Sequence, residues 1–142
     1  MMNRRGYSFY HYFVMFIISI TAGLLSTMSV YANKIDDVRI SFNDIYMSLL
    51  MTVWMFSFMS LYYGDFSVLL FGIFLVLSSF WAIRTQLFVN QNEYLQGMIP
   101  HHSMAVFMSK KLLEKGTHIK EFVEKIVSTQ ENEIKYMKTK AT

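Results

Sequence analysis

Three long stretches of the chain carry no formal charge and are rich in apolar residues. They contain 28, 20 and 18 residues, and they lie between Arg5 and Lys34, between Asp44 and Asp65, and between Asp65 and Arg84. A helix of about 20 apolar residues crosses the roughly 30 Å of hydrocarbon in a bilayer. Inside lipid the backbone must satisfy its own hydrogen bonds, which favours a continuous helix. The pattern therefore predicts three membrane-spanning helices, at about 9–32, 44–63 and 66–84.

The first stretch has a second interpretation, because it also resembles a secretory signal peptide. Arg4 and Arg5 precede it, and Val30-Tyr31-Ala32 resembles a cleavage site. A signal core is roughly 7 to 15 residues long, whereas this apolar run is longer, so we expect it to be retained as a span. Three spans place the chain ends on opposite sides of the membrane. The two arginines favour an internal N-terminus and an external tail.

From about Thr85 onward, charges appear every few residues and apolar residues recur at helical spacing. This predicts two amphipathic helices that meet near Lys115-Gly116, with Pro100 kinking or restarting the first. The inward residues expected on the second helix are Val123, Ile126, Val127, Gln130, Ile134 and Met137. Those expected to face them are Tyr94, Met98, His101, Met104, Ala105 and Met108. The prediction is an all-α protein with a membrane region over 1–84 and a helical hairpin over 85–142.

Composition and charge exclude several classes of function. The chain is 54% hydrophobic and 16% charged, with a net charge of +3. Its tail mixes eight lysines with six glutamates, so it presents no cationic face for nucleic acid, and the basic excess is expected to contact lipid headgroups. The sequence contains no catalytic motif and no charge inside a predicted span, so we expect neither an enzyme nor an ion-coupled transporter. Because there is no cysteine, a soft metal would need methionine and histidine ligands.

The densest group of candidate ligands lies in residues 98–108, which contain two histidines and three methionines. At 100° per residue, His101, Met104 and Met108 lie within about 60° of one another. Met98 and His102 form a second pair beside them. Thioether and imidazole ligands together suit Cu(I), and imidazole also binds Cu(II) or zinc. The alternative is structural, because such methionines often fill cores and such histidines are often only hydrogen-bonded.

A second methionine pattern lies in the second predicted span. Its four members are spaced four residues apart and share one helix face: Met47, Met51, Met55 and Met59. We interpret them as packing residues, because methionine packs well against neighbouring helices in lipid. The alternative interpretation is a track of thioethers that passes a soft ion along the membrane.

Two segments of the tail resemble the bacterial family catalogued as domain of unknown function 305. Residues 94–105 contain a Met-Ile-Pro-His-His run, and residues 130–137 contain a Gln-x-x-Glu-Ile-x-x-Met ending. The apolar segments upstream resemble its membrane-anchored subgroup. The sequence departs from the family at Asn90, where an aspartate is common, and this puts an accessory polar contact in doubt.

The resemblance implies a ferritin-like helical fold for the tail. For some members of the family it also implies copper binding outside the cytoplasm, through histidines and methionines. Carried over to this sequence, the ligands would be Met98, His101, His102, Met104 and Met108, with Met137 as an addition from the second helix.

We therefore expect a multi-pass protein of the inner cell membrane whose external tail binds copper, Cu(I) in preference to Cu(II), to buffer it or pass it on. Ligation requires neutral imidazole, so affinity should fall below about pH 6. The expected partners are the lipid bilayer, the metal ion and a second copy of the chain. The main alternative is a membrane-tethered interaction module, or an accessory subunit, that binds no metal.

Overall fold

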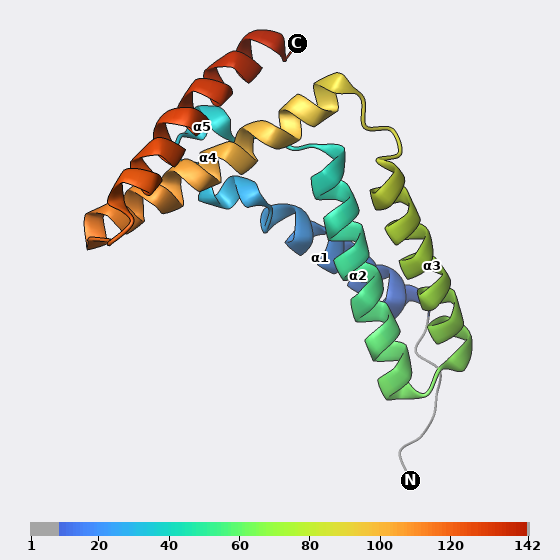
Figure 1. Ribbon diagram of the computed structural model, residues 1–142. Helices are drawn as coiled ribbons and strands as arrows, with labels where there is room; N and C mark the ends of the chain where they lie inside the picture. The colour runs from blue at the N-terminus through green and yellow to red at the C-terminus, as the bar shows by residue number, and fades with distance from the viewer. Residues whose placement is uncertain (1–8, 142) are drawn as a thin grey trace. The chain divides into compact units, whose positions relative to one another are not determined.

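The computed structural model describes residues 9–141, and all regular structure in that range is helical. The long helices are α1 (Phe9–Leu25), α2 (Phe42–Tyr63), α3 (Phe66–Thr85), α4 (Gln91–Lys115) and α5 (Lys120–Lys140) (Figure 1). Two short 3-10 helices, η1 (Met28–Tyr31) and η2 (Ile35–Asp37), lie between α1 and α2. The described chain has three segments long and apolar enough to cross a membrane, Tyr10–Tyr31, Phe42–Tyr63 and Phe66–Thr85. The second and third segments match the predicted spans as continuous helices. The first has the predicted extent, but the continuous helix predicted over about 9–32 is wrong, because α1 ends at Leu25 and the 3-10 helix η1 follows.

The described residues form two compact units. The first, the membrane unit, contains residues 9–25 and 45–87, and the second, the tail unit, contains residues 26–44 and 88–141. The segment 26–44, which we call the strap, connects the first two apolar helices along the chain. The strap belongs to the tail unit, and the hydrophobic pattern did not predict this association.

Small residues allow the helices of the membrane unit to approach one another closely. A Cβ atom added at Gly23 of α1 would lie 2.8 Å from the Cβ of Ser48, and one added at Gly72 of α3 would lie 2.5 Å from Ser57 Oγ. The hydroxyl of Ser57 donates to the Val53 carbonyl oxygen at 3.0 Å, so it is satisfied within its own helix. Helix α2 thus meets α1 and α3 through small side chains, as is typical of helices that pack in lipid.

The four methionines of α2 lie mostly on the surface of the membrane unit. Met47, Met51 and Met55 are exposed, and Met59 is half-buried. They are therefore available to lipid or to another protein. Beside them, the rings of Trp54 and Phe58 stack with their centroids 5.5 Å apart.

In the tail unit, α4 and α5 pack side by side as a hairpin (Figure 1). The core consists of Leu95, Ile99, Val106, Ile134 and Met137. The predicted inward face of α5 is confirmed, since Val123, Ile134 and Met137 are buried. The predicted inward face of α4 is only partly right: Met98 packs against the core, whereas Tyr94, His101 and Met108 are exposed. The buried face of α4 consists instead of Leu95, Ile99 and Val106, which lie within about 40° of one another around the helix.

Side chains cap the starts of α2 and α4. Asp44 Oδ2 accepts hydrogen bonds from both N–H and Oγ of Ser41 at 2.9 Å, which is one half of a capping box at the start of α2. Asn90 Oδ1 accepts from the Glu93 N–H at 3.0 Å, so asparagine supplies the cap in α4 where an aspartate was expected.

Pro100 and Gly116, the two residues expected to interrupt the helices of the tail, have different effects on α4. Helix α4 continues through Pro100 without a restart and ends at Lys115, before Gly116 with its positive φ of 83°. This confirms the predicted end of the helix. The residue that precedes α5 is Ile119, and Thr117 Oγ1 accepts a hydrogen bond from its N–H at 3.3 Å.

Candidate functional site

His102 has a hydrogen-bond acceptor at each of its ring nitrogens. Nδ1 lies 2.8 Å from the carbonyl oxygen of Met98, one turn earlier in α4. Nε2 lies 3.0 Å from Oε2 of Glu133 in α5, and the His102 side chain is only 12% exposed. When Nδ1–H donates to the carbonyl oxygen, the neutral ring turns the lone pair of Nε2 toward the carboxylate. When both ring nitrogens carry hydrogen, each donates to one of these two acceptors.

His101 lies beside His102 but faces solvent. The two rings meet edge to face with their centroids 5.8 Å apart. Successive residues of a helix diverge by about 100°, so His102 can face α5 while His101 remains exposed. The pair therefore offers one imidazole held inside the hairpin and one that is free to meet a ligand from solution.

The methionines of the predicted ligand set lie in different environments. Met104 and Met108 line a groove of about 370 Å³ together with Tyr31 of η1. Met98 is partly buried against the hairpin core. Met137 is 7% exposed and belongs to that core.

The six predicted ligands consequently fall into three groups. His101, Met104 and Met108 share the outer side of α4, Met98 and His102 lie toward α5, and Met137 is in the core. Over residues 9–141, the structure contains no group of three or more histidine, aspartate or glutamate side chains arranged to hold a metal ion. Any ion held by the outer group would have to use the methionine sulfurs.

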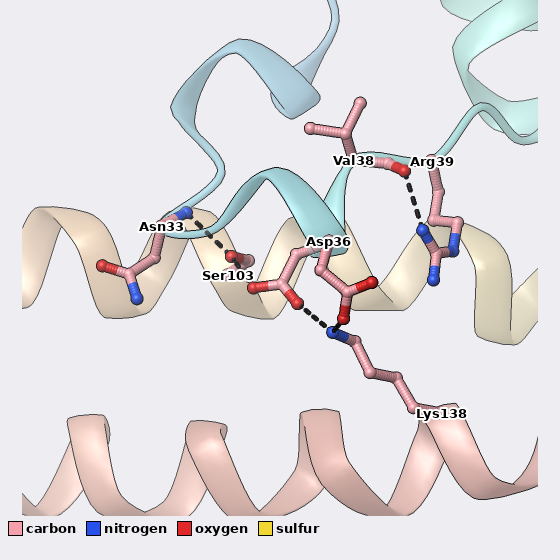
Figure 2. Close-up of polar contacts among 7 residues, drawn as sticks. Asn33, Asp36, Val38, Arg39, Ser103 and Lys138 are labelled. Carbon is pink, nitrogen blue, oxygen red and sulfur yellow. Dashed lines mark hydrogen bonds and ion pairs between the residues drawn. The ribbon is translucent and has the colours of Figure 1, made fainter.

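Ser103, the residue after the histidine pair, joins α4 to the strap. Its fully buried Oγ donates to Asp37 Oδ2 at 2.6 Å and accepts from the Asn33 N–H at 2.8 Å (Figure 2). Lys138 of α5 reaches the same place, where its Nζ lies 2.5 Å from Asp37 Oδ1 and also pairs with Asp36. We call these five residues the clasp, because they connect the strap, α4 and α5.

The clasp buries a carboxylate, and the charge of Lys138 compensates for it. Asp37 is 2% exposed, and among the described residues its Oδ1 has no hydrogen-bond donor of good geometry. An unpaired buried charge would be costly, so the ion pair with Lys138 is what allows the burial. The clasp therefore contributes a buried ion pair to the tail unit and is more than a surface contact.

The charges of the clasp shift each other's titration. The hydrogen bond and the positive charge of Lys138 hold the pKa of Asp36 below its usual value. Burial alone would lower the pKa of Lys138, but its contacts with Asp36 and Asp37 outweigh that effect and raise it. Elsewhere in the hairpin, the hydrogen bond from Lys110 at 2.7 Å lowers the pKa of Glu131 and adds a further link between α4 and α5.

Neither Glu133 nor any residue of the clasp was identified from the sequence as a site residue. Asp37 and Ser103 are 66 residues apart, and no spacing rule connects a loop aspartate to a helix serine. Glu133 is different, because it lies three residues after Gln130 and four before Met137 on the predicted inward face. Its spacing from the face residues was a signal that it could reach the first tail helix.

Comparisons with known proteins identify relatives of the chain. The family profile described as domain of unknown function (DUF305) matches residues 84–141, which include all of α4 and α5. The chain is also 43% identical over 131 residues to an uncharacterized protein of Acanthamoeba polyphaga mimivirus, a match that covers 87% of this chain and 86% of that protein. That relative is viral rather than bacterial. No solved structure matches the chain.

Proposed function

The chain belongs to the family of the domain of unknown function DUF305, and from this premise we propose that it is a membrane-anchored copper-binding protein. Helices α1, α2 and α3 would span the bilayer, and the tail unit would carry the metal. The observation that supports the proposal is the set of soft donors on the outer side of α4. His101, Met104 and Met108 lie there at intervals of three and four residues, and His101 and Met108 are exposed.

The donors of this set suit copper chemically. Two thioethers and an imidazole favour Cu(I) over Cu(II), and the absence of thiolates suits a compartment in which cysteine would oxidise. His102 and Met98 would serve as neighbouring donors. The hydrogen bond from His102 Nδ1 to the Met98 carbonyl is the kind of support that orients a metal-binding imidazole through its other nitrogen. Met137 would contribute to the core that positions α4.

The proposal also includes a side of the membrane. The charges of Arg4 and Arg5 favour an internal N-terminus, and three spans would then place the tail outside the cytoplasm. There the protein would buffer copper or pass it to another protein.

The test is a competition titration with Cu(I) on the full-length protein in detergent. The variant combines His101→Ala, Met104→Leu and Met108→Leu, and the matched control is His118→Ala, which removes a different exposed histidine. We expect one tight equivalent of copper in the wild type and the control, and at least a hundredfold weaker binding in the triple variant. Equal affinity in all three proteins would refute this site.

One observation favours a second candidate function, an interaction module without metal. Both ring nitrogens of His102 are already engaged by the protein itself, which suits a histidine whose role is to join α4 to α5. This alternative expects oligomers that persist in the presence of a copper chelator. The copper proposal instead expects that replacing His101 and His102 by alanine removes the metal and leaves the oligomeric state unchanged.

A further inference from the structure

A groove of about 370 Å³ lies between η1 and α4 in the tail unit. Its apolar lining comes from Tyr31, Met104, Phe107, Met108 and Leu112. Two basic residues, Lys111 and Lys115, complete the lining. The groove thus combines an apolar floor with cationic groups.

The apolar residues of the groove are poorly covered by the protein. Tyr31 is 54% exposed, Met108 56% and Leu112 40%. Isolated exposed apolar side chains are ordinary, but a contiguous cluster with a polar rim marks a surface that meets another apolar phase.

The position of η1 directly after α1 indicates that this apolar phase is a lipid bilayer. Only Ser26 and Thr27 separate the end of α1 from η1, and three residue steps span at most about 10 Å. Tyr31 is also the last residue of the apolar segment Tyr10–Tyr31. With α1 in a bilayer, η1 must remain close to the bilayer surface. Tyrosine favours the headgroup region, so Tyr31 suits that depth.

The lysines of the groove complement the charge of a lipid surface. Lys115 is the last residue of α4, and Lys111 pairs with Glu114 at 2.7 Å with both side chains exposed. Exposed ion pairs contribute little, so Lys111 can exchange this partner for a headgroup. Basic residues close to an anionic bilayer are attracted to it over about a Debye length.

We propose that this groove is a membrane-docking surface. Its apolar residues enter the headgroup region of the bilayer, and Lys111 and Lys115 contact the phosphates of anionic phospholipids. The proposal rests on the membrane anchoring in the proposed function but not on copper binding. Because Met104 and Met108 belong to both surfaces, the test uses metal-free protein.

The experiment places single spin labels on the full-length protein in lipid vesicles. The chain has no cysteine, so Leu112→Cys and the control Ser128→Cys, an exposed position of α5, each introduce one labelling site. Vesicles contain phosphatidylcholine with or without phosphatidylglycerol. Collision with oxygen, which dissolves in lipid, is compared with collision with a water-soluble nickel chelate. Co-flotation with the vesicles and far-UV circular dichroism establish anchoring and folding beforehand.

We expect the label at position 112, but not at 128, to be shielded from nickel and accessible to oxygen in the anionic vesicles. Adding Lys111→Gln and Lys115→Gln should lower the ratio of docked to undocked protein by about fivefold per lysine. A label at 112 as open to nickel as the label at 128, in protein that floats with the vesicles, overturns the docking surface alone. Dipolar broadening between labels at 112 would also overturn it, because a second copy would then cover the groove. Failure to float would instead refute the anchoring.

Discussion

At the scale of single residues, Met108 and Met137 lie in opposite environments although both were predicted ligands. Met137 is in the hairpin core, and Met108 is exposed on the outer side of α4. Met137→Ala should therefore lower the free energy of unfolding by about 2–4 kcal/mol, and Met108→Ala should change it by less than about 0.5 kcal/mol. Chemical unfolding of the full-length protein in detergent measures both. Equal losses for the two variants would contradict the assignment of Met137 to the core.

Lys138 is the residue of the clasp whose loss should matter most. Lys138→Met removes the charge that offsets the buried Asp37, and we expect a loss of roughly 3 kcal/mol in unfolding free energy. The same change at Lys135, an exposed residue of the same helix, is the control and should be nearly neutral. Adding Asp37→Asn to Lys138→Met should recover much of the loss. A double variant no more stable than the single one would show that the buried charge is not the cause.

The pKa shifts of Asp36 and Lys138 predict the pH ranges in which the stability of the protein should change. The folded-state pKa of Asp36 is below its ordinary 3.8, so its contribution is complete above that value and is lost as pH falls through the lowered pKa. The folded-state pKa of Lys138 is above its ordinary 10.5, so its contribution is complete below 10.5 and is lost as pH rises through the raised pKa. The stability difference between the wild type and the double variant with Asp37→Asn and Lys138→Met should thus be constant from about pH 5 to 9 and shrink at both extremes. A difference that changes near neutrality would implicate another group.

At the scale of helices, the close approach of α2 and α3 depends on Gly72 and Ser57. A methyl group at position 72 would meet Ser57 Oγ at 2.5 Å, but it would lie 3.5 Å from the Cα and Cβ of Ser57. Gly72→Ala should therefore destabilise the packing of α2 on α3 by roughly 1–3 kcal/mol, and Ser57→Ala in the same chain should restore most of it. Thermal unfolding in detergent measures this rescue. Additive losses in the double variant would place the strain elsewhere.

At the scale of the whole molecule, the proposed spans would place the strap and the tail on one side of the membrane, because both belong to one unit. As spans, the two apolar helices between them, α2 and α3, would return the chain to the side from which it started. Single cysteines at Ile35 and Ser128, both exposed, should thus react with an impermeant maleimide from the same side of sealed vesicles. A cysteine at Tyr62, near the turn between α2 and α3, should react only from the other side. Labelling of positions 35 and 128 from opposite sides would contradict the topology.

The sequence by itself determined the features that depend on local physics. An uncharged apolar run of 18 residues or more favours a helix wherever it lies, and the end of α4 follows from Lys115 and the positive φ available to Gly116. The inward face of α5 was predictable for the same reason, since its charged residues leave only one apolar stripe. Copper binding and its ligands stay predictions, because they rest on donor chemistry and on resemblance.

Only the tertiary structure decided how the pieces of the tail unit combine. Along α4, apolar residues occur on more than one side, so periodicity could not choose between the stripe of Leu95 and Ile99 and the stripe of Met104 and Met108. In the structure, the aliphatic stripe packs against α5 and the strap, and the stripe of Met104 and Met108 lies outside this core. The clasp could not be predicted from the sequence either. Burial of Asp37 becomes favourable only when Ser103 and Lys138, both distant along the chain, lie beside it.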